Sequence, residues 1–278
     1  MKLSAEQFKQ AKNKRLTLLG MSGVGKTHLS KLLGQQDKWY HYSGDYRIGA
    51  KYLNHKILDN IKDKLAQQAW FAQLLENDSI TLENHITFDN LSSVSAYLGK
   101  VGNPNQGGLP IDEFSTRQAL HKQAEINTML DVPKFINKSQ SQGFDHFIND
   151  AGGSLCELDN DLVYKTLAEH TVILYIRASQ ANESALIERA RTHPKPLYYQ
   201  ADFLSAQLST YLEENNLTYI AQIDPDVFVG WIFPRLLAHR KPKYEAIAQQ
   251  YGYTIDSEDL YQCRQADDVF ELIDGALD

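Results

Sequence analysis

Residues 20–27 have the spacing G-x-x-x-x-G-K-T and come directly after an apolar run at residues 16–19. In such a loop, successive backbone N–H groups point inward at phosphates, and the N-terminus of the following helix adds partial positive charge. Lys26 would reach the β- and γ-phosphates, and the Thr27 hydroxyl would bind Mg²⁺. The pattern therefore predicts a nucleoside triphosphate site formed by Gly20, Ser22, Gly23, Val24, Gly25, Lys26, Thr27 and His28.

Asp45 and Arg47 follow residues 39–42, which are typical of a second strand. A carboxylate at the carboxyl end of a strand can face the γ-phosphate and accept the proton of an attacking hydroxyl. An arginine two residues further on could hold an acidic group of the acceptor with two parallel hydrogen bonds. The alternative is that Asp45 caps the next helix and that Arg47 faces solvent.

Asp150, Gly152 and Gly153 follow a third apolar strand at residues 144–150. Asp150 would bind Mg²⁺ through water or orient the nucleophile. The two glycines would let backbone amides approach the substrate. The alternative is a plain turn between a strand and a helix.

Two arginines, Arg189 and Arg191, stand near the end of a helix predicted at residues 183–191, just before a proline-containing loop. They could close over the phosphates as a lid and neutralise charge on the transferring phosphoryl group. Arg191 is the better candidate because it is nearer the loop. The alternative is a solvated helix face, which is the usual place of a charge run.

These segments, in this order, resemble the P-loop small-molecule kinases, especially the group that contains the shikimate, gluconate, adenylylsulfate and nucleoside monophosphate kinases. Residues 44–47 are similar to the acid and arginine that meet the acceptor in that group, and residues 150–153 look like its third-strand substrate loop. Residues 191–197 are similar to its lid, with Lys195 where a second arginine is expected. Residues 240–248 resemble the late R-x-P-x-Y segment of shikimate kinases.

The resemblance implies a three-layer α/β fold of the P-loop NTPase type with a mainly parallel five-stranded sheet, and it implies ATP and Mg²⁺ as the bound species. The implied catalytic residues are Lys26, Asp45 and Arg191, and the implied metal-binding residues are Thr27 and Asp150. The implied acceptor-binding residues are Asp45, Arg47, Gly152, Gly153 and Arg240.

Residues 77–143 are polar and turn-rich, and they are long for a simple connection. Because they keep apolar anchors, we predict an acceptor-binding lobe inserted there and a lid at residues 185–200, within one domain spanning residues 1–278. Strands are predicted at residues 15–19, 39–42, 144–150 and 171–176. Helices are predicted at residues 26–34, 115–129, 183–191 and 203–214.

The chain has 278 residues, of which 42% are hydrophobic, and a formal net charge of −7 at pH 7. This composition suits a folded protein and argues against a general nucleic-acid-binding or membrane-binding surface. The nine histidines lack zinc-ligand spacing, and the two cysteines lack C-x-x-C spacing. Residues 1–15 lack the apolar core of a signal peptide, so a cytoplasmic protein is expected.

The function predicted from these features is ATP-dependent phosphoryl transfer to a small, hydroxylated and anionic metabolite. The alternative is a P-loop ATPase or a nucleotide-dependent switch that acts on a protein partner. A kinase that modifies nucleic acid is a third interpretation, which the acidic net charge weakens. The sequence leaves the acceptor and the oligomeric state open.

Overall fold

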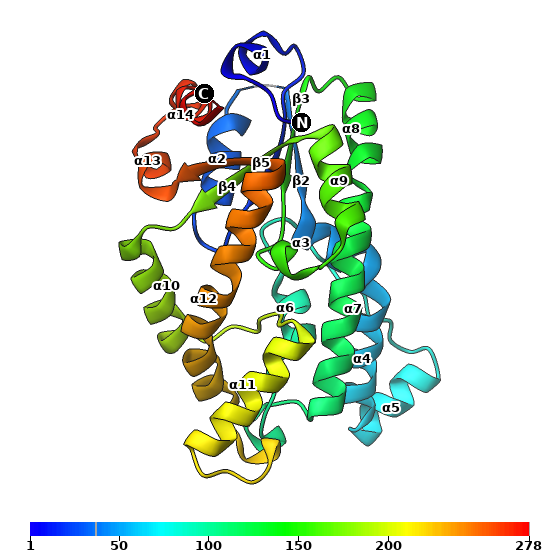
Figure 1. Cartoon of the computed structure of the whole chain (residues 1–278). Coiled ribbons are helices and arrows are strands. Elements are labelled where there is room, and N and C mark those ends of the chain that lie inside the picture. Colours follow the sequence, from blue (N-terminus) through cyan, green and yellow to red (C-terminus); the bar gives the residue numbers. More distant parts are fainter. Residues whose placement is uncertain (37, 278) are drawn as a thin grey trace.

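The computed structural model describes residues 1–36 and 38–277, and its centre is a parallel sheet of five strands (Figure 1). The strands follow the order β2-β3-β1-β4-β5 across the sheet. Their bounds are β1 (Arg15–Leu19), β2 (Trp39–Ser43), β3 (His146–Asp150), β4 (Val172–Arg177) and β5 (Gly252–Asp256). Asp150 pairs in register with Leu18 of β1 and with Ser43 of β2. Three strands therefore end at the same edge, which is where open α/β sheets bind ligands.

Helices cover both faces of the sheet. The ring of Trp39 lies 6.2 Å from Phe270 of α14 on one face, and Tyr175 lies 5.3 Å from Tyr244 of α12 on the other. α2 shares the first face, while α8 and α9 share the second. The bounds of these helices are α2 (Lys26–Gly34), α8 (Val132–Ser141), α9 (Asp161–His170), α12 (Pro225–Tyr251) and α14 (Ala266–Leu277).

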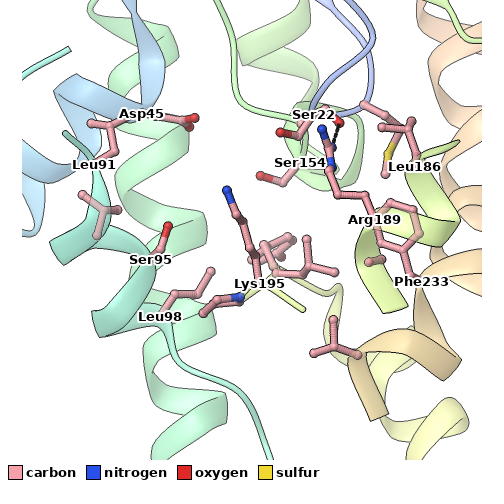
Figure 2. Close-up of a pocket in the computed structure, with 18 of the residues that line it drawn as sticks. Ser22, Asp45, Leu91, Ser95, Leu98, Ser154, Leu186, Arg189, Lys195 and Phe233 are labelled. Carbon is pink, nitrogen blue, oxygen red and sulfur yellow. Dashed lines mark hydrogen bonds between the residues drawn. The ribbon is translucent and has the colours of Figure 1, made fainter. Parts of the chain in front are cut away.

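A second set of helices lies beyond the carboxyl ends of the strands (Figure 1). α6, α7 and α10, together with the first half of α12, border a cavity of about 350 Å³ against the loop between β1 and α2 (Figure 2). The helices not yet given bounds are α1 (Ala5–Gln10), α3 (Gly44–Arg47), the π-helix Ile48–Tyr52, α4 (Asn54–Ala66), α5 (Ala69–Glu76), α6 (Ser92–Leu98), α7 (Ile111–Leu130), α10 (Gln180–Thr192), α11 (Ala201–Glu214) and α13 (Ser257–Gln262). Short 3-10 turns occur at Pro104–Gln106, Leu155–Glu157 and Ile220–Gln222.

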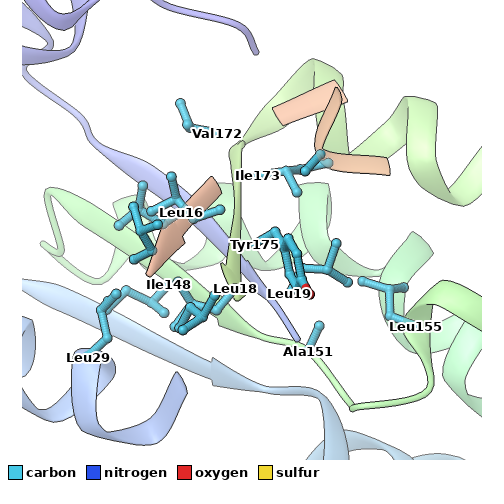
Figure 3. Close-up of a cluster of buried hydrophobic side chains, with 14 of the residues drawn as sticks. Leu16, Leu18, Leu19, Leu29, Ile148, Ala151, Leu155, Val172, Ile173 and Tyr175 are labelled. Atoms are coloured by element: carbon cyan, nitrogen blue, oxygen red, sulfur yellow. The ribbon is translucent and has the colours of Figure 1, made fainter. Parts of the chain in front are cut away.

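The main hydrophobic core occupies both faces of the sheet (Figure 3). Leu16 and Leu18 of β1 are fully buried beside Leu29 of α2, whereas Tyr175 and Leu155 lie on the other side. Burial of a leucine side chain stabilises the fold by about 1.5–3 kcal/mol relative to exposure. This packing fixes β1, and with it the start of the glycine-rich loop.

Two smaller cores hold the helices around the cavity. One joins Ile48 to Val94 of α6, and the other joins Phe114 of α7 to residues of α11 and α12. Met129, near the end of α7, belongs to the main core instead. The segment 77–143 is thus divided, because α6 and the middle of α7, at His121, border the cavity while the end of α7 and α8 cover the sheet.

The predicted strands and the three-layer α/β class with a five-stranded parallel sheet are confirmed. α12 and β5 have no counterpart among the predicted elements. Pro234 and Pro242 lie inside α12, where proline normally ends or kinks a helix, and β5 begins with Gly252, a residue type that strands disfavour. In the part of the chain that the structure describes, no helix combines the length and the apolar character that a membrane span needs.

Gly252→Ala is expected to lower the free energy of unfolding by about 1–3 kcal/mol, because overpacking at a rigid contact has a cost of this order. A Cβ atom on Gly252 would lie 2.3 Å from the carbonyl oxygen of Ile173, and a backbone atom cannot swing away. Gly275→Ala in α14 is the matched control, since nothing lies within 4 Å of a Cβ atom there. The control should be neutral or more stable by up to about 1 kcal/mol. Equal unfolding midpoints in urea for both variants would contradict this account.

Candidate active site

The loop between β1 and α2 has the backbone geometry that phosphate binding requires. Gly20 and Gly23 have φ values of +143° and +95°, and a Cβ atom on Gly20 would lie 2.8 Å from the carbonyl oxygen of Ile176. The Lys26 side chain is buried, and its Nζ donates to the carbonyl oxygens of Gly20 (2.8 Å) and Met21 (3.1 Å). The ammonium group thus lies against the loop, where phosphate oxygens could replace these carbonyl acceptors.

Thr27 and Asp150 lie together beside this loop. The Thr27 hydroxyl donates to Asp150 Oδ2 at 3.2 Å, and His41 Nε2 lies 3.7 Å from the same oxygen. Among the described residues, no group of three or more His, Cys, Asp or Glu side chains is placed to hold a metal ion. One hydroxyl and one carboxylate nevertheless fit Mg²⁺ bound to a nucleotide, because Mg²⁺ there keeps several waters and takes further oxygens from the phosphates.

Asp45 lines the cavity and is accessible from it. Desolvation by the surrounding walls of the cavity raises the pKa of its carboxyl group, and the negative charge of Asp150 raises it further, while Lys26 lowers it. Ser43 caps α3, since its hydroxyl accepts a hydrogen bond from the Tyr46 N–H at 3.3 Å. The capping alternative for Asp45 is therefore wrong, and Figure 2 shows its carboxylate at one side of the cavity.

A second carboxyl group, that of Glu125 in α7, lies beside Asp45 and has no part in the sequence predictions. Its side chain is fully buried, and Oε2 accepts a hydrogen bond from the hydroxyl of Ser154. A Cβ atom on Gly152 would lie 2.6 Å from Glu125 Oε1 and 3.3 Å from Asp45 Oδ1. Both carboxyl groups therefore pack against this glycine. Burial raises the pKa of Glu125 to about 7, and the charge of Asp45 adds to the rise.

Glu125 does leave a signal in the sequence. Gln118, His121 and Glu125 recur at intervals of three and four residues and lie on one buried face of α7. Polar residues rarely occupy the buried face of a helix unless they are paired or functional. Burial, followed by the charge of Arg240, lowers the pKa of His121 to about 4, so this histidine is neutral at pH 7.

Arg189, and not Arg191, contacts the glycine-rich loop. Arg189 Nη2 donates to the carbonyl oxygen of Ser22 at 3.1 Å, and a Cβ atom on Gly23 would lie 2.6 Å from the same nitrogen. Arg191 instead packs against Gly230 of α12 and lines a separate surface recess. Two residues along an α-helix are separated by about 200° around its axis, so α10 cannot turn both arginines toward the loop.

Arg47 and Arg240, the predicted partners of an acceptor anion, each have a carboxylate partner within the chain. Arg47 Nη2 lies 2.6 Å from Asp131 Oδ2, away from the described lining of the cavity. Arg240 lines the cavity, but its Nε and Nη2 lie 2.7 Å and 2.6 Å from Glu157 Oε2. An acceptor anion would have to compete with these carboxylates, so both roles stay predictions.

The remaining predicted residues surround the loop. A Cβ atom on Gly153 would lie 3.2 Å from the backbone nitrogen of Ser22, so the segment after β3 approaches the loop closely. His28 stacks on Tyr261 at 5.7 Å between ring centroids, on the side of α13. Figure 2 shows Lys195 extending into the cavity between Asp45 and Ser154.

No protein-family model matches the chain, and no curated protein matches it in sequence. Among solved structures, the chain is similar to a shikimate kinase from Bacteroides thetaiotaomicron, with a TM-score of 0.44 and 15% sequence identity. The likeness covers 93% of this chain and 94% of that chain. A likeness this distant carries no inference about activity or acceptor.

Glu125→Gln is expected to change how stability depends on pH. The pKa of Glu125 rises from 4.5 to about 7 on folding. The folded chain therefore holds a proton that the unfolded chain has lost, and the free energy of unfolding falls as pH rises from about 4.5 to 7, by an amount on the order of 3 kcal/mol. Urea denaturation across this range should show a flatter dependence for Glu125→Gln than for wild type.

Glu169→Gln, at an exposed site on α9, is the control for this substitution and should follow wild type. The same pH slope in wild type and Glu125→Gln would show that folding leaves the pKa of Glu125 unchanged.

Proposed function

We propose that this protein is an ATP-dependent phosphotransferase that acts on a hydroxyl group of a small acceptor. The observation that carries the proposal is the convergence of Lys26, the Thr27–Asp150 pair and Asp45 at one edge of the sheet. The charges of Asp150 and Asp45 both act on Lys26, which is why these groups form one site. This edge opens onto a cavity large enough for a small molecule.

On the donor side, the glycine-rich loop and Lys26 would hold the phosphates of ATP. Lys26 would exchange the carbonyl oxygens of Gly20 and Met21 for phosphate oxygens. Thr27 and Asp150 would hold Mg²⁺, which neutralises phosphate charge when it is bound.

On the acceptor side, Asp45 would accept the proton of the acceptor hydroxyl. The acceptor oxygen forms a bond to the γ-phosphorus, the bond from that phosphorus to the β–γ bridging oxygen breaks, and ADP leaves. The raised pKa of Asp45 makes it a stronger base than an ordinary aspartate. Glu125 and Gly152 would hold this carboxylate in place, and Gly153 would bring the chain close to the loop.

Arg189 would stabilise charge on the transferring phosphoryl group, which is the role predicted above for Arg191. Its guanidinium group already lies at the loop. Residues 185–200 contain the later part of α10 and the segment that carries Lys195; both line the cavity, which supports the proposal of a lid. The lobe 77–143 supplies α6 as one wall of the cavity, in agreement with acceptor binding.

Lys26→Met is expected to impair ATP binding, whereas Asp45→Asn is expected to impair phosphoryl transfer and leave nucleotide binding intact. Lys26→Met should weaken ATP binding and lower ATP consumption by about 10²-fold or more. Asp45→Asn should lower kcat by about 10²–10⁴-fold, because the general base is lost, while the Kd for ADP stays within a few-fold of wild type. Coupled ADP-release assays and calorimetry measure both effects.

The kinase proposal also requires a phosphorylated acceptor that mass spectrometry detects. ATP hydrolysis that no hydroxylated compound accelerates would contradict it and favour the ATPase alternative.

Arg189→Met and Arg191→Met form a matched pair on one helix. Arg189→Met should lower kcat by about 10–10³-fold, because a charge near the phosphates is removed. Arg191→Met should stay close to wild type, because Arg191 lies against α12. A larger loss in the Arg191 variant would show that α10 turns or moves during the reaction.

A further inference from the structure

The cavity has apolar walls on two sides. α6 and the residue before it contribute Leu91, Val94 and Leu98, and the facing wall includes Leu186 of α10 and Phe233 of α12. These side chains come from separate elements but face the same space (Figure 2). A ligand that carried hydroxyl groups on every carbon would leave many of them without hydrogen-bond partners against such walls. An apolar body would instead be buried favourably.

The charged groups at the cavity are few, and most have partners. Asp45 lies at one end, as the proposed base. Arg240 is paired with Glu157, and Arg189 donates to the glycine-rich loop. His121 is neutral at pH 7 because burial lowers its pKa to about 4.

Lys195 differs from these groups. It is exposed, it extends into the cavity, and it forms no ion pair or hydrogen bond with residues 1–36 or 38–277. The other cavity cation without a fixed charge partner, Arg189, is held at the phosphate loop by its bond to Ser22. One cation is therefore available for an anionic group of the acceptor.

We propose that the acceptor is an amphipathic hydroxy acid. Its hydroxyl group lies at Asp45, its apolar body lies between α6 and the wall formed by α10 and α12, and its single anionic group binds Lys195. This inference rests on the proposed function, because it places the reacting hydroxyl at the proposed base. It narrows the acceptor class by excluding polyhydroxylated acids that lack an apolar body.

Three probes of matched chemistry test the inference by binding, independently of turnover. 4-(Hydroxymethyl)benzoate has the hydroxyl, the apolar body and the charge. 4-Methylbenzyl alcohol lacks the charge, and gluconate lacks the apolar body. Calorimetry on the full chain with saturating ADP should give a Kd for 4-(hydroxymethyl)benzoate about 10-fold or more below that for either other probe.

Two variants assign the effect to the two proposed contacts. Lys195→Gln should weaken binding of 4-(hydroxymethyl)benzoate by about 10-fold and leave 4-methylbenzyl alcohol unchanged. Leu91→Ser should weaken both aromatic probes by about 3–10-fold. Leu91 is the N-cap residue of α6, where serine is favoured, so this change should not unfold the helix. Lys62→Gln, at an exposed site on α4, is the control for loss of one positive charge.

Gluconate binding as tight as that of 4-(hydroxymethyl)benzoate would overturn the inference, as would equal effects of Lys195→Gln and Lys62→Gln. Absence of binding of 4-(hydroxymethyl)benzoate to folded protein that binds ADP would also overturn it, while phosphorylation of another hydroxyl compound would leave the proposed function standing. Failure to bind ADP or ATP would instead remove the proposed function.

Discussion

Three carboxyl groups and one ammonium group lie close together at the carboxyl edge of the sheet, and the repulsion among the carboxyl groups constrains everything built around them. Asp150 raises the pKa of Asp45, and Asp45 in turn raises that of Glu125. Lys26 opposes this repulsion for Asp45. Like charges held this close together do not stabilise a fold, and such clusters are typical of functional sites.

Gly152 is the backbone position that leaves room for two of these carboxyl groups. Glu125 Oε1 and Asp45 Oδ1 both approach the place that a Cβ atom on Gly152 would take. Any side chain there would push the carboxyl groups apart or force one of them into the cavity. The register of β3 with β1 and β2 sets the height of this glycine, because Asp150 is paired on both sides. The strand pairing thus determines the spacing of the acids.

The sequence alone predicts those site residues that come directly after a predicted strand. The glycine-rich loop and the acids Asp45 and Asp150 lie at strand ends, and strand ends can be located from apolar runs. Glu125 could not be placed in this way, because it comes from a helix 80 residues after Asp45 and reaches the site only through the packing of α7 on the sheet. Its interaction with Ser154 joins residues 29 positions apart.

The contacts of the arginine side chains could not be predicted from the sequence either. Arg189 and Arg191 are equivalent as residue types, and only the rotation of α10 against α12 decides which one faces the loop. Arg47 is predicted from the sequence to bind the acceptor, yet Asp131, 84 residues away, is its partner. Partner choice for a long charged side chain depends on tertiary contacts, and spacing along the chain does not contain that information.

α12 runs from the cavity to the sheet as one continuous helix. It spans about 40 Å at the usual rise per residue, with Phe233 at the cavity and its last turn leading directly into β5. The wall that α12 provides is therefore continuous with the sheet. α6, by contrast, is held by a small separate core through Val94. Substitutions in α6 can therefore reshape one wall of the cavity while α12 and the glycine-rich loop stay in place.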